Sequence, residues 1–322
     1  MGKQITLDHG SGGRLTLELI REVFNTEPGL DAAVLGNLAF TTDSHSIKPL
    51  FFNGGDIGKL AVSGTVNDLL CVGAKPMYLS SAFIIEAGFE IESLKQISDS
   101  MRKEAANAGV EIVCGDTKVV ENGKCDGVYI NTSGIGRIVK PITGMGVSDG
   151  DVVIVTGTIG DHGFAILNER EKLAVDTDLK SDAESLTGLI LPLLESDIEI
   201  KMMRDPTRGG LAMCLNELCL NRNFGFEIEE ECIPIKEEVR VLSELLGIEP
   251  YYSANEGKMV LVVERSQAER TLDKLKQHPS GRDAAIIGHI NADTPAKVIL
   301  KTRFGTKRLL RMPISDKMPR IC

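Results

Sequence analysis

Apolar positions along the first half of the chain recur with two different periods, which predict alternating strands and helices. Short apolar runs bounded by turn residues are typical of strands, and longer stretches with apolar residues at helical spacing are typical of helices. The expected strands are residues 38–42, 78–86, 112–114 and 128–138, and the expected helices are residues 15–24, 57–72 and 91–108.

A second series of elements follows a Pro- and Gly-containing break near residues 141–150. Its expected strands are residues 151–156, 226–228, 259–263, 285–287 and 298–300, and its expected helices are residues 162–169, 183–194, 208–220, 237–246 and 267–277. The pattern predicts two α+β domains, residues 1–140 and 141–311, and a tail of residues 312–322. It does not determine the strand order.

Composition and charge narrow the class of protein. With 322 residues, 42% of them hydrophobic, the chain can bury two cores. The net charge is −10 and no long Lys/Arg block occurs, so nucleic acid is excluded as the main partner. No stretch of about 20 apolar residues is present, and the first residues lack the apolar core of a signal peptide. We therefore expect a cytoplasmic protein without a membrane partner.

The seven cysteines do not form a disulfide or zinc pattern. They are an odd number, scattered through a long chain, and no Cys-x-x-Cys occurs. The five histidines do not pair with them at zinc-ligand spacing. We expect reduced thiols, most of them in the cores.

The last residue, Cys322, is the exception among these thiols. Pro313 and Pro319 disfavour a helix in the last eleven residues, so the segment can extend over about 35 Å and carry the thiol into a distant pocket. The alternative is a disordered end that happens to finish in Cys. A prenyl anchor is excluded, because its Cys would stand four residues from the end.

Polar residues interrupt the helix expected at residues 57–72. Asn67 and Asp68 stand among apolar neighbours, where an unpaired carboxylate would be costly without a cation, a hydrogen-bond network or an opening to water. The alternatives are a solvent-facing turn and a buried polar bridge.

Three further acids lie at predicted element ends. Asp43 and Asp116 end predicted strands, as ligands at a sheet edge do, although each alone is a plain strand-end residue. Asp56 is flanked by glycines and has the alternative of capping the next helix. Together with Asp68 they predict a Mg²⁺ site that bridges a polyphosphate, with Lys59 or Lys118 balancing the charge.

No standard nucleotide motif accompanies these acids. Residues 54–60 have the wrong spacing for a Walker A loop and lack the Ser/Thr after Lys, and residues 134–137 lack the third Gly of a dinucleotide fingerprint. The glycine-rich residues 9–14 precede a predicted helix, where backbone amides can bind an anion, or they are simply flexible. A nucleotide site here is therefore of another type.

Two other Asp residues precede predicted helices in the second half. Asp205, followed by Pro206, is either a ligand or a helix N-cap. For Asp161, beside His162, we favour capping over a nucleotide contact.

The motifs just described resemble a known superfamily. The segments 41–43, 55–59, 64–69, 115–118 and 205–211 are similar, in this order, to the ATP-binding superfamily of aminoimidazole ribonucleotide synthetase and selenophosphate synthetase. Within it, residues 9–14, Asn-Glu-Gly-Lys at 255–258 and the ending Pro-Arg-Ile-Cys at 319–322 resemble the HypE family of hydrogenase maturation factors. The resemblance covers essentially the whole chain. Selenophosphate synthetase differs by a reactive Cys or Sec near its N-terminus, whereas no Cys precedes Cys71 here.

The resemblance implies an ATP- and Mg²⁺-dependent S-carbamoyl dehydratase. It would convert a carbamoyl group on Cys322 into a thiocyanate, which supplies cyanide to the iron of nickel–iron hydrogenase. The implied partners are the carbamoyltransferase HypF, which loads Cys322, and the HypC–HypD iron scaffold, which receives the cyanide. The implied fold is a homodimer whose N-terminal domains pair into a β-barrel.

The resemblance also implies roles for single residues. Those near the carbamoyl group are Lys118 and Glu256, although Glu256 can also be read as a turn residue before a strand. The others would contact ATP. Asp43, Asp56, Asp68 and Asp205 would also hold Mg²⁺, whereas Lys59, Asn67, Asp116 and Thr117 would contact the nucleotide alone. Two other hypotheses remain, a non-catalytic thiol carrier with a regulatory nucleotide site and a sister synthetase acting on a free small molecule.

Overall fold

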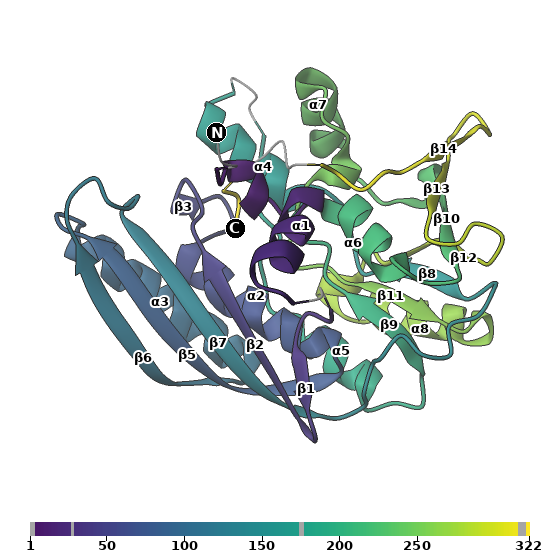
Figure 1. Cartoon of the computed structure of the whole chain (residues 1–322), viewed down its shortest axis with the longest axis horizontal. Helices are drawn as coiled ribbons and strands as arrows, with labels where there is room; N and C mark the ends of the chain where they lie inside the picture. The colour runs from purple at the N-terminus through teal and green to yellow at the C-terminus, as the bar shows by residue number, and fades with distance from the viewer. Residues whose placement is uncertain (1–3, 27–28, 174–176, 315–319) are drawn as a thin grey trace.

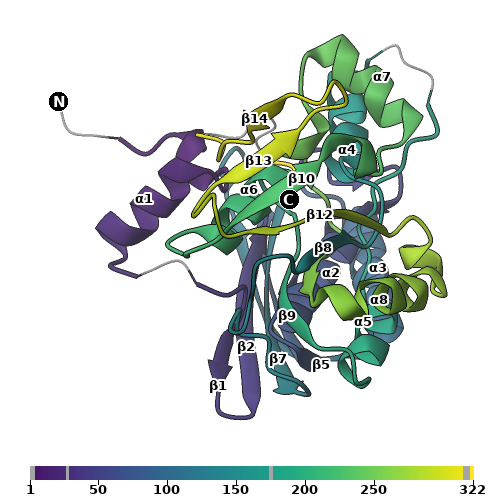
Figure 2. The same cartoon turned by 90° about the vertical axis from the view of Figure 1, so that its right-hand side faces the viewer.

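The computed structural model describes residues 4–26, 29–173, 177–314 and 320–322. Two β-sheets lie side by side, one from each half of the chain (Figure 1). Helix α1 (Arg14–Val23) lies in front of the boundary between them in this view and stands out from both sheets in Figure 2. The sheets are separated in sequence by residues 139–151. The α+β class and the two-domain architecture are thereby confirmed.

The N-terminal sheet has the strand order β1-β2-β7-β5-β6. Only the β5–β6 pair is parallel, because helix α3 (Ile91–Ala108) crosses over between these two strands. The strands are β1 (Ala33–Leu35), β2 (Leu38–His45), β5 (Ala74–Glu86), β6 (Glu111–Val120) and β7 (Val128–Ile138), with a separate pair, β3 (Phe51–Phe52) and β4 (Gly55–Asp56).

Helix α2 (Ile57–Cys71) lies at the centre of the molecule. It packs against β2, β5 and β7 on one side and against α3 and helix α5 of the second domain on others. Almost all of its residues are buried, which explains why its sequence is apolar on all sides rather than along one stripe.

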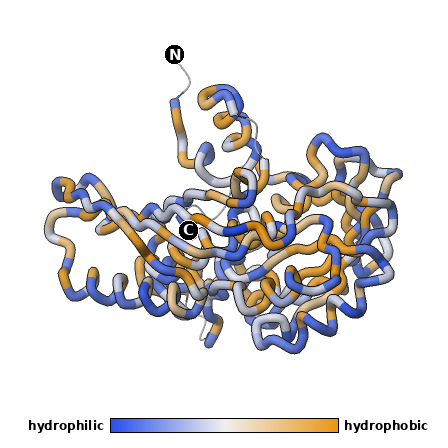
Figure 3. The backbone as a smooth tube through the Cα atoms, turned by 90° about the horizontal axis from the view of Figure 1, so that it is seen from below, coloured by the Kyte–Doolittle hydropathy of each residue, from blue (hydrophilic) through white to orange (hydrophobic). Residues whose placement is uncertain are grey.

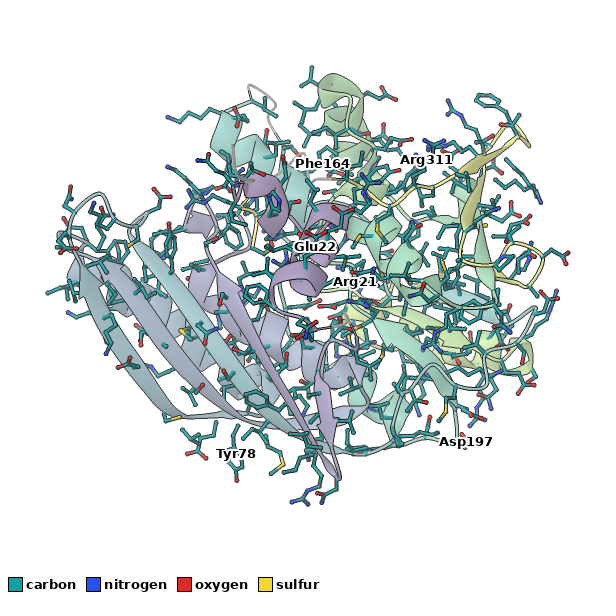
Figure 4. All side chains as sticks on the ribbon, viewed as in Figure 1. Arg21, Glu22, Tyr78, Phe164, Asp197 and Arg311 are labelled. Carbon is teal, nitrogen blue, oxygen red and sulfur yellow. The ribbon has the colours of Figure 1, made fainter. Side chains whose placement is uncertain are left out.

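The face of the N-terminal sheet opposite α2 carries exposed apolar side chains. Figure 4 labels Tyr78 on this sheet. The exposed large apolar residues of its strands include Leu38, Phe40, Tyr78, Ile84 and Ile135. Few monomeric proteins leave so many apolar side chains together on one sheet, so this face is suited to a partner.

The C-terminal sheet has the order β14-β13-β10-β12-β8-β11-β9 (Figure 2). Its strands are β8 (Val152–Val155), β9 (Ile200–Arg204), β10 (Gly225–Glu229), β11 (Val260–Val263), β12 (Ala285–Asn291), β13 (Val298–Lys301) and β14 (Lys307–Leu309). The helices are α4 (Asp161–Glu171), α5 (Thr187–Leu194), α6 (Gly210–Cys219), α7 (Glu237–Leu246) and α8 (Ala268–Lys276). Single 3₁₀ turns occur at Leu7–Gly10, Glu230–Cys232, Pro250–Tyr252, Arg265–Gln267 and Pro279–Gly281. Strands β8 and β11 are buried throughout, and hydrophobic segments fill this lobe in Figure 3.

Two strand ends were predicted wrongly, and both bear on the site. Strand β2 continues to His45 and β6 continues to Val120, so Asp43 and Asp116 lie inside strands rather than after them. Both strands extend through polar residues because neighbouring strands provide backbone partners there: Asp43 pairs with Thr132 and Asp116 with Ala82. Strand β9 was not predicted.

Helix α5 begins later than predicted, at Thr187 rather than near residue 183. The backbone N–H of Ser185 donates to Glu104 and that of Leu186 to the Asn67 side chain. These amides are satisfied by side chains of the first domain, so residues 183–186 follow an irregular path.

The predicted tail is described only at its two ends, and residues 315–319 lie outside the described residues. Its predicted mobility therefore stays a prediction. All seven cysteines are described, and none of them forms a disulfide. Among the described residues, no helix has the length and apolarity that crossing a membrane requires.

Candidate active site

A cavity of about 370 Å³ lies between the two domains. Strand β2 contributes Asp43, helix α2 contributes Asp68, and the segments around β9 and β11 contribute Asp205 and Glu256. The terminal residue Cys322 lines the same cavity. The fold thus brings together four of the predicted site acids, from both domains, with the predicted acceptor thiol.

Burial and mutual repulsion raise the pKa values of Asp68, Asp205 and Glu256. Burial, followed by the charge of Asp205, raises the pKa of Asp68 well above its usual range, and the same two causes act on Glu256. For Asp205, burial and then the charge of Asp31 raise the pKa to about 8. A cation would relieve this repulsion.

The cavity fits a hard divalent cation. Glu256 is 3% exposed, and its Oε1 has no hydrogen-bond partner in the structure. Several buried carboxylates around one space are the ligands that Mg²⁺ takes alongside phosphate oxygens.

The sequence analysis missed Asp31, which lies in this cluster. Ligand atoms of Asp31, Cys71 and Asp205 all lie within 4.8 Å of one another. Arg204 forms ion pairs with Asp31 at 3.0 Å and with Glu217 at 3.1 Å. Asp31 directly precedes the apolar residues that lead into β1, and this position was its only signal.

Two basic side chains near these acids were also missed. Arg208 lines the cavity, and the negative charge of Cys322, followed by that of Asp43, raises its pKa. His45 is almost fully buried, with Nε2 3.4 Å from Asp43 Oδ2, and burial lowers its pKa. Arg208 is therefore a fixed positive charge beside the terminal residue.

Three predicted nucleotide ligands have structural contacts outside the cavity. Asp56 Oδ1 accepts hydrogen bonds from the N–H groups of Gly58 and Lys59, at 2.8 and 3.0 Å, so it caps α2 as the alternative held. Lys59 Nζ donates to the Gly54 carbonyl at 3.1 Å. Asn67 is the buried polar bridge, since its amide donates to the carbonyls of Glu184 and Glu256.

The predicted residues on β6 lie apart from the cavity. Asp116, Thr117 and Lys118 are exposed on this edge strand, and Lys118 Nζ forms an ion pair with Asp116 at 3.1 Å. Strands β7 and β5 separate β6 from β2, which places β6 roughly 14 Å from Asp43 across the sheet. Within one chain these three side chains are not brought to the other acids.

The capping alternatives for Asp205 and Asp161 are both wrong. Helix α6 begins after Gly209, which leaves Asp205 in the acidic cluster rather than at the helix start. For α4 the N-cap is Gly160. The Asp161 carboxylate instead accepts a hydrogen bond from Thr158 Oγ1 at 2.6 Å and pairs with Lys236 at 2.7 Å.

The glycine-rich segment does precede a helix, α1, but its amides bind the chain itself. Arg14 N donates to the Pro313 carbonyl at 3.0 Å. A Cβ on Gly13 would lie 2.8 Å from the carbonyl oxygens of Pro313 and Ile314, so only glycine allows this approach.

The terminal residues dock beside β2. Ser46 N donates to the Cys322 carbonyl at 3.1 Å, and Lys48 N donates to the Arg320 carbonyl at 3.2 Å. The Ile321 side chain is 1% exposed and belongs to the hydrophobic core. Cys322 therefore lies in the cavity because its two neighbours are held.

This fold is that of the AIR synthase related proteins: residues 29–138 match the N-terminal domain of that family and residues 148–301 its C-terminal domain. The carbamoyl dehydratase HypE of Azotobacter vinelandii is 44% identical over 99% of this chain and 97% of its own length. The HypE of Escherichia coli K12 is also 44% identical, over 99% of each chain.

Solved structures agree with these relatives. A HypE–HypF complex contains a chain that is 48% identical, with a TM-score of 0.88 over 94% of this chain and 100% of that one. A hydrogenase maturation protein HypE in complex with ATP is 42% identical, with a TM-score of 0.86 over 99% and 100% of the two chains. The chain belongs to the HypE family of carbamoyl dehydratases.

Proposed function

We propose that this protein dehydrates a carbamoyl group carried on its own Cys322, at the expense of ATP, to give a thiocyanate. The observation that carries the proposal is the position of Cys322 in the same cavity as Asp43, Asp68, Asp205 and Glu256. A bound ATP in one relative supports the nucleotide, and the HypF complex of another supports a carbamoyltransferase as the source of the group.

The chemistry balances without a redox partner. The thiocarbamate oxygen attacks the γ-phosphorus of ATP, and ADP leaves. Loss of the O-phosphate together with the two nitrogen protons then yields S–C≡N, phosphate and protons. The chain must hold the tail in line, balance charge and accept protons.

Six cavity residues suit these tasks. Glu256 is the proposed proton acceptor, because its Oε1 is buried without a hydrogen-bond partner. Arg208 stabilises negative charge at the terminal residue. Asp68 and Asp205, with Asp31 and Asp43, would hold Mg²⁺. When bound, the ion would neutralise charge on the phosphates. The ligand role expected for Asp56 stays a prediction, because its Oδ1 caps α2.

The proposal includes a second copy of the chain. The exposed apolar face of the N-terminal sheet suits a homodimer, and Lys118 with Asp116 and Thr117 would then complete a partner's site. The cyanide would pass to a HypC–HypD scaffold and on to nickel–iron hydrogenase. We place the reaction in the cytoplasm, where cysteines that form no disulfide stay reduced.

Intact mass tests the proposal. After carbamoylation of Cys322, addition of Mg-ATP should lower the mass by one water and release one ADP per chain. Cys322→Ala, which cannot be loaded, should show neither change. An unchanged mass of the loaded protein, with ATP intact, would overturn the dehydratase proposal and favour the carrier hypothesis.

A further inference from the structure

The start of helix α4 contacts the main chain of the terminal segment. His162 is fully buried, and its Nε2 lies 2.5 Å from the Ile321 carbonyl oxygen. Phe52 packs edge-on against the imidazole, with 5.8 Å between ring centroids, and restricts the ring's orientation. This buried contact sits one residue from the thiol.

The hydrogen bonds around His162 decide which nitrogen carries the proton. Ser181 Oγ accepts the N–H of Ala183 at 3.1 Å and lies 2.7 Å from His162 Nδ1. The hydroxyl proton is thus free to be donated to Nδ1, which leaves the ring proton on Nε2, facing the Ile321 carbonyl. Burial lowers the pKa of His162, in keeping with a neutral ring.

The same helix supplies a second donor near its other end. Arg170 Nη2 donates to the Arg320 carbonyl at 2.6 Å, while its Nε donates to the Lys48 carbonyl at 2.8 Å. Arg170 thus links the tail to the loop that contains Lys48. The backbone N–H of Lys48 also donates to the Arg320 carbonyl. Both α4 donors bind backbone carbonyls and leave the thiol of Cys322 untouched.

We propose that His162 and Arg170 are positioning residues, which bind the backbone of residues 320 and 321 and so place the Cys322 sulfur in the acidic cavity. Because their hydrogen bonds to residues 320 and 321 are made to carbonyl oxygens, they can hold the tail in the same way whether the thiol is free, carbamoylated or cyanated. The role of this placement in dehydration rests on the proposed function, whereas the docking itself does not.

A matched pair of substitutions tests the docking. In His162→Gln the amide nitrogen can take the place of Nε2 and keep the bond to Ile321. In His162→Asn the shorter amide reaches only the Nδ1 position, so it keeps Ser181 and loses the tail. Cys322 should react with iodoacetamide about tenfold faster in the Asn variant, and within about threefold of wild type in the Gln variant.

Site-resolved mass spectrometry measures the alkylation of a second cysteine in the same sample, which serves as an internal control. Cys232 is exposed and distant from the tail in sequence, so its alkylation rate reports reagent activity in every sample. His289→Asn, on β12, should leave the Cys322 rate unchanged, and Arg170→Ala should raise it. Equal Cys322 rates in wild type and in both His162 variants would overturn the proposal.

Dehydration adds a second measurement. With carbamoylated protein, single-turnover water loss should slow several-fold in His162→Asn and be restored in His162→Gln, with ATP affinity unchanged in both. A slowing that the Gln variant does not reverse would contradict a positioning role. If wild type itself loses no water, the proposed function fails, and the alkylation rates still decide whether α4 docks the tail.

Discussion

The acids of the cavity and Asp116 on β6 differ in burial and in the direction in which their pKa values are shifted. In the cavity, Asp68, Asp205 and Glu256 are held by both domains, and burial raises their pKa values. On β6, Asp116 is exposed, and Lys118 lowers its pKa through a hydrogen bond. One chain therefore brings the acids of the proposed cation site together with the thiol, whereas Lys118 lies on an edge strand apart from them.

Mixing two inactive variants tests most directly whether the residues of β6 act in the cavity of a second subunit. Glu256→Gln removes the proposed proton acceptor and Lys118→Ala the proposed charge on β6, and each should lower water loss by on the order of 100-fold or more. If Lys118 serves the partner's cavity, a 1:1 mixture of the two variants should regain about a quarter of wild-type water loss. Half of the dimers then contain one subunit of each variant, and one of the two cavities in such a dimer has both an intact Glu256 and an intact Lys118.

Mass spectrometry of subunits refolded or exchanged together measures that recovery. Glu104→Gln is a matched control, since this buried carboxylate accepts the Ser185 N–H at 2.7 Å and the Asn107 amide at 3.4 Å, and Gln can still accept the shorter bond. A mixture as inactive as its components would show that Lys118 serves its own chain or none.

Placing a charge on the exposed sheet face should separate the copies. Phe40, 42% exposed on β2, lies on the face that we assign to the dimer. Phe40→Glu would bury a charge there and should weaken association by on the order of 100-fold or more, giving monomers in light scattering. Leu245→Glu, on α7, changes an exposed apolar residue elsewhere and should leave the mass unchanged. A Phe40→Glu dimer would contradict the proposed interface.

The stability of the metal-free protein should depend on pH in part through the buried acids of the cavity. Burial and then the charge of Asp31 raise the pKa of Asp205 from its ordinary value of 3.8 to about 8, so its contribution to stability is complete below pH ~4 and is lost as pH rises through 8. Asp205→Asn should therefore raise the free energy of unfolding by about 1–3 kcal/mol near pH 8.5 in EDTA. Urea titrations at pH 5 and 8.5 measure this difference.

The exposed acid gives the matched comparison. Asp116→Asn should leave both titrations unchanged. If Asp205→Asn destabilises the protein at pH 8.5 as much as at pH 5, the repulsion among the buried carboxylates has been assigned wrongly.

The smallest effect is expected at Asp56. Asp56→Ala should lower the free energy of unfolding by about 1 kcal/mol, because two amides of α2 lose their acceptor, while Asp56→Asn should restore most of it. Thermal melts of the two variants measure the difference. Loss of Mg-ATP binding in Asp56→Asn, with stability intact, would instead favour the ligand role that the resemblance implied.

Most helices and strands could be predicted from the sequence, but the ends of the strands that carry site residues could not. The helix at Ile91–Ala108 and the strand at Val128–Ile138 were predicted at their observed limits, because their apolar spacing reflects burial directly. Strand β6 was predicted to end six residues early, since its polar residues are satisfied by a neighbouring strand distant in sequence.

The site residues, too, could be predicted only where the local sequence indicated them. Asp68 was identified because a carboxylate in an apolar helix requires an explanation. Asp31 gave no such signal, because it precedes a strand and joins the cluster only through tertiary packing. His162 was treated as part of a helix start, since nothing in its local sequence indicates that the chain's last residues contact it.

The Asn67 bridge has a consequence for how this molecule moves. One side-chain amide accepts the Leu186 N–H at 2.9 Å and donates to the carbonyls of Glu184 and Glu256, so it fastens a helix of the first domain to two segments of the second. Opening the interdomain cavity would leave these groups unsatisfied. We therefore expect the two domains to keep their relative positions, so that the cavity lined by Cys322 keeps its shape.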